Sequence, residues 1–269
     1  MSTPAADTVS ALDRGMALLA CFDETRRSLG PTELSRLTGI PRPSVVRLAA
    51  TLLARRWLQT EPGGERYMLG PGVVSLARIY LSGLDVRAAA RPVMQALADR
   101  FGASVHLAVD DGEALVLIEA CRAREAMWTT RLDVGSRVPL ATSALGRAWL
   151  ADGPADVRDE RLARLAAAHD PTTWPAVEAG VRDALAEHAR QGWCLSLGEF
   201  HRDINSAAVC LRGPRDERMV LNCGGPVFLM SPARLRAEVA PALRDEARRL
   251  AEIIGGRVAT PPSTLEDAA

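Results

Sequence analysis

Apolar residues near the start of the chain recur at the three- and four-residue intervals of amphipathic helices. These intervals predict three successive helices, over 9–22, 32–38 and 41–56. A proline pair, Pro41 and Pro43, opens the third of them. Because proline is tolerated only before a helix or within its first turn, the pair fixes where this helix begins. The break lets the third helix cross the second at an angle.

The third predicted helix has two different faces. Val45, Leu48 and Leu52 fall on one side at a period of 3.6 residues, which predicts that this side packs inward. The opposite side carries small residues and one arginine: Pro43, Arg47, Ala50 and Ala54. A face that only contacts water more commonly carries long charged side chains. This outer face is therefore suited to close approach to another surface.

Two short strands follow, over 57–61 and 66–69, and a Pro-Gly-Gly turn joins them. Helix, helix, helix and hairpin is the order of a winged helix-turn-helix domain, which we expect over 9–70. In such domains the N-terminal end of the recognition helix enters the major groove of DNA. We expect DNA contacts from Arg42, Pro43, Ser44, Val46, Arg47 and Arg66.

The charge of this part of the chain supports DNA as the partner. The formal charge of all 269 residues sums to zero, which argues against a protein that coats nucleic acid or membrane with its whole surface. Between residues 26 and 66, however, there are eight arginines and three glutamates, a net charge of +5. Because phosphate attraction supplies much of the affinity for DNA, we expect Arg47 to read bases and Arg42 and Arg66 to hold phosphates. A helix-turn-helix that binds proteins instead of DNA is the alternative.

A connecting helix at 73–82, within a linker at 71–83, precedes a second domain expected over 84–256. Its helices are predicted over 86–101, 142–151, 156–169, 175–191 and 231–254. Its strands are predicted over 104–109, 114–120, 126–132, 193–198, 206–212 and 217–224. About six strands bracketed by helices favour an α+β fold with an antiparallel sheet. The small polar tail at 257–269 is expected to be disordered.

The sequence contains no pattern that points to catalysis or to a metal. The five cysteines are scattered, odd in number and without a C-x-x-C pair, so we expect buried thiols rather than disulfides or a zinc site. Motifs of nucleophile elbows, phosphate loops and zinc proteases are missing. Asp110 and Asp111 fall in a hairpin turn, and His201 has no relay partner near it in sequence. We expect a protein without a cofactor that is not an enzyme.

The chain shows no sign of export or of membrane insertion. Its first residues lack a cationic segment followed by an apolar one, and no run of about 18 apolar residues occurs later. These features predict a soluble, cytoplasmic protein without a membrane partner.

Four segments together resemble the IclR family of bacterial transcription regulators. They are ELSRLTGIPRPSVVRL, RYMLGPGVVSLA, ARPVMQALADRFGASVHLAV and VGSRVPLATSALGRAWLA, and the likeness extends over roughly 9–256. The resemblance implies an N-terminal winged helix, a linker helix used in dimerisation and a GAF-like C-terminal domain that binds a small metabolite. It also implies that small carboxylic acids, some of them aromatic, modulate binding to double-stranded operator DNA. A homodimer or tetramer would match the two-fold symmetry of operators.

The resemblance places the effector over the sheet, against the start of the helix that begins in TSALG. Backbone N–H groups of Ala144 and Leu145 and the helix dipole would attract a carboxylate there. The expected effector-binding positions are Met127, Trp128, Thr130, Ser143, Ala144, Leu145, Ser196, Ile204, Ser206, Asn222 and Gly224. Relatives that bind small acids carry bulkier polar groups at several of these positions, so this chain has room for a larger or aromatic ligand. Ordinary core packing is the alternative for each residue.

Overall fold

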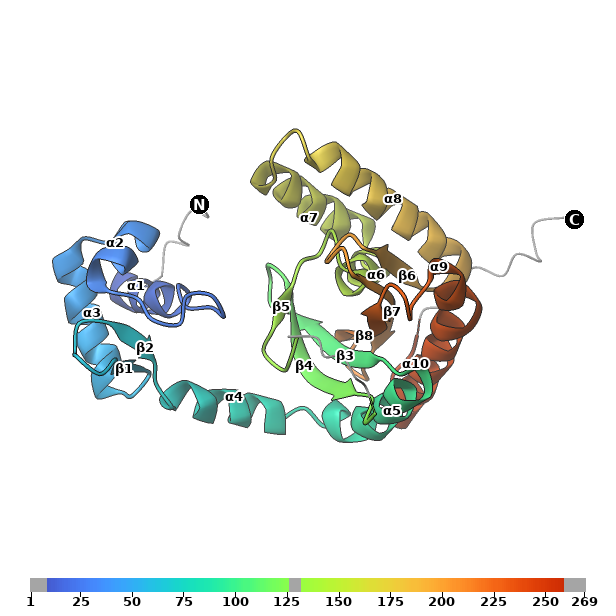
Figure 1. Cartoon of the computed structure of the whole chain (residues 1–269), viewed down its shortest axis with the longest axis horizontal. Helices are drawn as coiled ribbons and strands as arrows, with labels where there is room; N and C mark the ends of the chain where they lie inside the picture. The colour runs from blue at the N-terminus through green and yellow to red at the C-terminus, as the bar shows by residue number, and fades with distance from the viewer. Residues whose placement is uncertain (1–8, 126–131, 259–269) are drawn as a thin grey trace, which may run out of the picture. The chain divides into compact units, whose positions relative to one another are not determined.

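The computed structural model describes residues 9–125 and 132–258 of the 269-residue chain. The chain divides into two compact units, Met1–Gly83 and Leu84–Ala269 (Figure 1). Each unit encloses its own hydrophobic core. None of the helices in the described stretches combines the length and apolar character needed to cross a bilayer.

The first unit consists of three helices, a hairpin and a fourth helix, coloured blue to cyan in Figure 1. Its elements are α1 (Ser10–Leu19), α2 (Pro31–Thr38), α3 (Arg42–Ala54), β1 (Leu58–Thr60), β2 (Tyr67–Leu69) and α4 (Gly72–Ser82). The hairpin strands are antiparallel, with Leu58 opposite Leu69 and Thr60 opposite Tyr67. Core side chains come from α1, α2, α3 and the hairpin: Leu18, Leu34, Val45, Ala49, Leu52, Leu58 and Tyr67. The predicted order of a winged helix-turn-helix is confirmed.

The turn between α2 and α3 explains the angle between these helices. Gly39 ends α2 in the left-handed region, with φ at 71°, and its N–H donates to the Ser35 carbonyl oxygen at 2.9 Å. A residue with a Cβ atom adopts this backbone conformation at a cost, which is why glycine suits a helix C-terminus. Two residues later Pro41 precedes the first turn of α3, and Pro43 lies within that turn. The chain therefore stops one helix and starts the next within three residues.

The second unit is built on a six-stranded antiparallel sheet in the order β5-β4-β3-β8-β7-β6. The strands are β3 (Ser104–Asp110), β4 (Leu115–Arg122), β5 (Arg137–Val138), β6 (Cys194–Leu197), β7 (Ile204–Arg212) and β8 (Arg218–Pro226). In the middle of the sheet, His106 lies opposite Asn222, which lies opposite Ala208. The predicted α+β class with an antiparallel sheet is confirmed.

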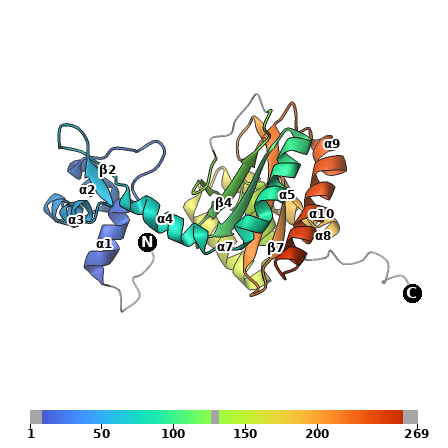
Figure 2. The same ribbon diagram turned by 90° about the horizontal axis from the view of Figure 1, so that it is seen from below.

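Helices cover both faces of this sheet (Figure 2). On one face, α5 (Val86–Phe101) packs against β3 and β4, and α10 (Ala240–Ile253) packs against β7, β8 and α5. On the other face, α6 (Ala144–Asp152) contacts β6, β7 and β8, and α8 (Trp174–Gln191) packs against α6. Side chains of α7 (Ala155–Ala168) cover the same side. Thus α6 is enclosed between the sheet and an outer helical layer.

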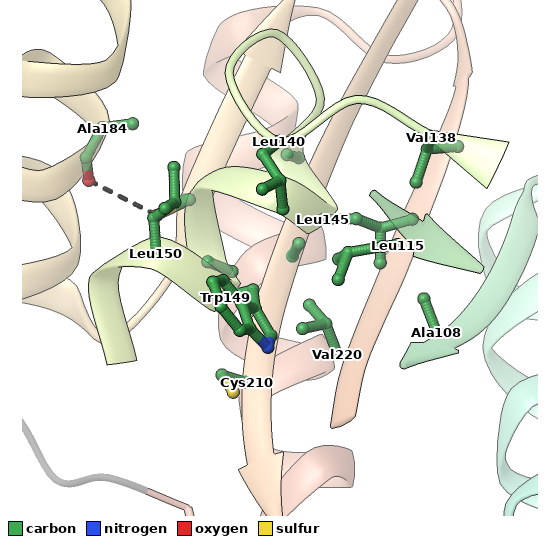
Figure 3. Close-up of a cluster of buried hydrophobic side chains, with 14 of the residues drawn as sticks. Ala108, Leu115, Val138, Leu140, Leu145, Trp149, Leu150, Ala184, Cys210 and Val220 are labelled. Atoms are coloured by element: carbon green, nitrogen blue, oxygen red, sulfur yellow. Dashed lines mark hydrogen bonds between the residues drawn. The ribbon is translucent and has the colours of Figure 1, made fainter. Parts of the chain in front are cut away.

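A hydrophobic core fills the space between α6 and the sheet (Figure 3). Leu145 and Trp149 of α6 belong to it together with Cys210 of β7 and Val220 of β8. The guanidinium of Arg218 lies 3.8 Å from the centroid of the Trp149 ring, a cation–π contact at the edge of the core. Every residue from 144 to 150 is buried, so the position of α6 is fixed over its whole first two turns.

All five cysteines are buried and none forms a disulfide, as expected from the sequence. Burial disfavours the thiolate, so it raises the pKa of Cys223 to about 12 and raises the pKa of Cys194 and Cys210 as well. The Cys194 thiol donates to the carbonyl oxygen of Ala184 at 3.4 Å. These thiols act as small core side chains.

The segment predicted as a loop before α6 contains the short strand β5. Val138 pairs with Leu115, and Arg137 pairs with Val116. Without β5, β4 would be the edge strand of the sheet and would present unpaired backbone groups, and two residues of the neighbouring loop are enough to pair with some of them. Of the strand predicted at 126–132, only Leu132 lies among the described residues.

The helix predicted over 231–254 is interrupted. A short α9 (Pro232–Arg234) continues into a π-helical turn (Leu235–Val239) before α10. The Ala240 N–H bonds to the Leu235 carbonyl, five residues back, and Pro241 has no N–H to offer the next carbonyl. Proline near the start of a helical stretch is thus accommodated by widening one turn.

Candidate functional site

The outer face of α3 is exposed along its N-terminal half. Arg42, Pro43, Val46 and Arg47 are exposed and Ser44 is half-buried. Neither Arg42 nor Arg47 has an ion-pair partner within the described part of the chain. The structure therefore brings five of the predicted DNA-contact residues to one surface, with two uncompensated positive charges.

The other arginines of this unit add to the same positive charge. Of the eight arginines between residues 26 and 66, Arg26 pairs with Asp23, and Arg66 pairs with Glu33 and Glu61. The remaining six have no carboxylate partner in the stretches that the structure describes: Arg27, Arg36, Arg42, Arg47, Arg55 and Arg56. A surface of this kind attracts phosphates.

Arg66, the sixth predicted DNA contact, immediately precedes β2 and makes several hydrogen bonds and ion pairs within the first unit. Its Nη2 donates to the Ser28 carbonyl oxygen at 2.6 Å, and its Nε donates to the Ser28 hydroxyl at 3.0 Å. Its guanidinium is 2.8 Å from Glu33, whose carboxylate also accepts from the Gly30 N–H at the start of α2. These two contacts lower the pKa of Glu33. Arg66 thus connects the hairpin to α2, and its charge is partly neutralised.

The second unit contains a cavity of about 400 Å³ between the start of α6 and the sheet. Its lining is mostly apolar and comes from β3, β5, β7, β8, the start of α6 and the loop before β7: His106, Leu132, Val138, Ser143, Ala144, Leu145, Phe200, His201, Ile204, Ser206, Asn222 and Gly224. Seven of the predicted effector-binding residues are among them. Met127, Trp128 and Thr130 lie outside the described residues.

The start of α6 faces this cavity with free hydrogen-bond donors. The Ser143 hydroxyl caps the helix by accepting from the Gly146 N–H at 2.9 Å, and it donates to the Pro139 carbonyl oxygen at 2.6 Å. The N–H groups of Ala144 and Leu145 make no hydrogen bond to any described residue. Gly146 permits this arrangement, because a Cβ atom there would lie 2.2 Å from the Cα of Leu140.

Ser196 was predicted in the cavity but does not line it. Its side chain is buried, and its hydroxyl donates to the Thr142 carbonyl oxygen at 2.7 Å. This bond supports the segment that leads into Ser143 and α6. Ser196 therefore stabilises the segment that forms this wall of the cavity without facing the cavity itself.

Sequence reasoning missed His106, which lies beside Asn222 in the cavity lining. The Asn222 side-chain oxygen lies 3.1 Å from the backbone nitrogen and 3.0 Å from Nδ1 of His106. Burial lowers the pKa of His106 to about 4. The strand period of two could have indicated it, because residues 106 and 108 share a face and Ala108 belongs to the core beneath α6.

Phe200 and His201 were also missed as lining residues, and they lie in the loop between β6 and β7. The residue before them, Glu199, forms an ion pair with the buried Arg147 of α6. The guanidinium also donates to the carbonyl oxygens of Ala141 and Leu195. This loop is thereby attached to the helix that forms the opposite wall.

A winged helix-turn-helix joined to an α+β domain that encloses a ligand-sized cavity is the architecture of a transcription regulator that responds to a small molecule. Residues 11–62 match the model of the IclR helix-turn-helix domain, and residues 78–252 match the model of the bacterial transcriptional regulator IclR C-terminal domain. The HTH-type transcriptional regulator TsaQ1/TsaQ2 of Comamonas testosteroni is 31% identical, over 96% of this chain and 92% of that protein. The chain therefore belongs to the IclR family of bacterial transcriptional regulators.

Solved structures share the fold over nearly the whole chain. An IclR family transcriptional regulator from Brucella abortus superposes with a TM-score of 0.88 at 35% identity, over 94% of this chain and 95% of that one. An IclR homolog from Microbacterium hydrocarbonoxydans, complexed with 4-hydroxybenzoate, superposes with a TM-score of 0.69 at 23% identity, over 90% and 97% of the two chains. The second likeness is one of fold alone.

Proposed function

We propose that this regulator binds a small carboxylic acid in the cavity of its second unit and that the bound acid changes its affinity for operator DNA. The observation that carries the proposal is the start of α6, where the free N–H groups of Ala144 and Leu145 border the cavity. Such donors and the positive end of a helix dipole attract an anion without a charged side chain. The volume of about 400 Å³ is typical of small-molecule sites, and the homolog from Microbacterium hydrocarbonoxydans holds an aromatic acid.

A matched pair of variants at Ser206 tests the cavity. Ser206 is half-buried and lines the cavity from β7. Ser206→Asp adds a negative charge there, whereas Ser206→Asn adds a neutral side chain of the same shape. Calorimetry with a panel of carboxylic acids should show binding to the wild type and to Ser206→Asn and loss of binding to Ser206→Asp. Equal affinities of the two variants would place the acid elsewhere.

The effect on DNA needs its own measurement. An effector that distinguishes the two states of a regulator typically changes affinity by about 5- to 150-fold, which corresponds to about 1 to 3 kcal/mol of coupling. Operator binding should therefore be titrated with and without a saturating acid. A bound acid that leaves operator affinity unchanged would refute the regulatory part of the proposal.

For DNA recognition, we propose that Arg47, with Ser44 and Val46 beside it, contacts base edges in the major groove, with Pro43 at the same surface. Arg42 and the exposed part of Arg66 would contact phosphates. The exposure of the α3 face and its unpaired arginines support this assignment. A gel shift at increasing salt separates it from the alternative, a helix-turn-helix that binds a protein. DNA affinity should fall steeply with salt, in proportion to the phosphates contacted.

We further propose that the working unit is a homodimer, or a tetramer of two dimers, joined through α1 and α4. Both helices expose large apolar side chains, which are Leu12 and Met16 on α1 and Val74, Leu76, Ile79 and Tyr80 on α4. None of the residues of α4 is buried within its own unit. Such apolar faces mark contact surfaces between proteins. Light scattering that gives a monomeric mass, with and without DNA, would refute the dimer.

This function requires no catalytic step. We propose that the protein acts in the cytoplasm, where operator DNA and dissolved acids are both present.

A further inference from the structure

The helix α3 lacks the side chains that pair with two of the four bases. Its 13 residues, RPSVVRLAATLLA, include no asparagine, glutamine, aspartate or glutamate. In the major groove, asparagine and glutamine bind adenine through N6 and N7, whereas aspartate and glutamate accept a hydrogen bond from cytosine N4. A recognition helix without these four residue types therefore has no matched partner for adenine or for cytosine.

The exposed face of α3 instead combines one cation with apolar side chains. Pro43, Val46, Arg47 and Ala50 are all exposed, and their spacing of three or four residues places them on one side of the helix. The Arg47 guanidinium has no ion-pair partner in the described part of the chain. Val46, directly beside it in sequence, is 40% exposed although it is a large apolar residue. This face thus offers one fork of N–H donors bordered by carbon atoms.

Polar side chains around this face are engaged within the first unit. The Thr51 hydroxyl donates to the Arg47 carbonyl oxygen at 3.3 Å, and the Gln59 side-chain nitrogen donates to the Leu69 carbonyl oxygen at 3.2 Å. The Glu33 carboxylate accepts from the Gly30 N–H at 2.8 Å and pairs with an arginine of the hairpin. Arg47 and its apolar neighbours therefore carry the base-reading chemistry of α3.

We propose that α3 reads a guanine through Arg47 and the methyl group of a nearby thymine through Val46. This inference rests on the proposed DNA recognition and names the bases that it selects. A guanidinium fork matches O6 and N7 of guanine, and an apolar side chain contacts the C5-methyl group of thymine. The helix rises about 1.5 Å per residue and bases stack about 3.4 Å apart, so consecutive residues contact base pairs that lie within about two steps of each other.

Replacement of single base atoms tests this assignment. Duplexes are first selected from random sequence by the full chain, and the strongly preferred positions should include a G·C pair and a T·A pair within about two steps. At that guanine, 7-deazaguanine lacks N7 and should weaken binding about 10- to 100-fold. Inosine keeps both N7 and O6 and should bind as guanine does. At that thymine, deoxyuridine lacks the methyl group and should weaken binding about 4-fold.

Two variants assign each base atom to its side chain, and each variant is the control for the other. In Val46→Ala, thymine and uracil should bind equally while the effect of 7-deazaguanine remains. In Arg47→Ala, the effect of 7-deazaguanine should disappear while the preference for thymine over uracil remains. Both residues are exposed, so neither variant removes a core side chain. The same base replacements outside the preferred positions should change nothing.

Several outcomes would overturn the inference and leave DNA recognition intact. They are a preferred sequence whose binding depends on neither guanine N7 nor the thymine methyl, a 7-deazaguanine effect that survives in Arg47→Ala, or a uracil effect that survives in Val46→Ala. If the chain selects no sequence from random DNA, the proposed base recognition itself is refuted and the inference falls with it.

Discussion

The Arg147 guanidinium binds both carboxylate oxygens of Glu199, each at 2.5 Å, and so connects α6 to the loop that carries Phe200 and His201. The Arg147 side chain is 3% exposed, and the Glu199 side chain is 36% exposed. Because the start of α6 and this loop line the same cavity, the ion pair fixes the distance between two of its walls.

Removal of Glu199 should destabilise the second unit and loosen the cavity. In Glu199→Ala the buried guanidinium keeps its carbonyl contacts but loses its counter-charge, and we expect a loss of about 1 to 3 kcal/mol, with the partial exposure of Glu199 taken into account. Chemical unfolding monitored on the second unit measures this loss. Arg137, an exposed arginine on β5 that pairs with Glu113, supplies the control: Glu113→Ala should have little effect. A stability unchanged in Glu199→Ala would show that the pair is only a surface contact.

Replacement of Arg47 should reduce both affinity for the operator and discrimination against other DNA. A side chain that contacts base edges contributes about 1 to 3 kcal/mol, so Arg47→Ala should weaken operator binding about 5- to 150-fold and random DNA much less. Arg164→Ala, on an exposed arginine of α7, is the matched control and should leave both affinities unchanged. If Arg47→Ala weakens operator and random DNA equally, Arg47 contacts phosphates instead.

Replacement of Arg66 should show a different pattern. This side chain stabilises the hairpin through Ser28 and Glu33, so Arg66→Ala should weaken all DNA sequences alike and also lower the melting temperature of the first unit. A melting temperature that stays unchanged would mean that these contacts add nothing to the fold.

The stability of the second unit should fall as the pH falls from 6.5 towards 4. The pKa of His106 is about 4 in the folded protein and near its ordinary value of 6.5 in the unfolded chain. Between these pH values the unfolded chain binds a proton that the folded chain excludes, so the free energy of unfolding should be about 2 kcal/mol lower at pH 5 than at pH 7. In His106→Phe, this part of the pH dependence of the free energy of unfolding should be lost. The pKa values of Asp99 and Asp133 are lowered in the folded protein, so protonation of these two carboxylates reduces the free energy of unfolding only at more acidic pH. If the free energy of unfolding depends on pH in the same way in the wild type and in His106→Phe, His106 is not a buried neutral histidine.

A charge on α4 should separate the proposed dimer. Ile79 is 65% exposed and belongs to the apolar face of this helix, so Ile79→Asp should leave the fold intact and shift the mass measured by light scattering towards the monomer. Operator affinity should fall with it, because two half-sites are no longer read together. Arg78→Asp changes the charged residue next to Ile79 on the same helix, and it is the control for charge alone.

The sequence predicts the helices and most strands because their apolar residues repeat with a clear period. Val45 and Leu52 show it on α3, and both are buried. The sequence could not predict β5, because a strand of two residues has no period. It also could not predict the π-helical turn, which arises because Pro241 has no N–H to donate to a carbonyl of the preceding turn.

The cavity could be predicted only in part for a similar reason. Small residues before a helix indicate the start of α6 at Ser143, and this is a local signal. His106 depends on the strand register that brings it beside Asn222, 116 positions away, and no local pattern contains that pairing. Ser196 needed the same three-dimensional information, because only the structure shows its hydroxyl bonded to the Thr142 carbonyl.

The five buried thiols can report how often the structure around them opens. A thiol reagent attacks the thiolate, and burial both limits solvent access to these side chains and raises their pKa values, so that the thiolate is disfavoured while they remain packed. Modification must therefore wait for an opening of the surrounding structure, and its rate at each cysteine measures how often that region opens. Cys21 reports on the first unit, whereas Cys194, Cys210 and Cys223 report on three neighbouring strands of the second. The cysteines thus report on separate sites, and the opening rates of the two units can be measured independently in one intact protein.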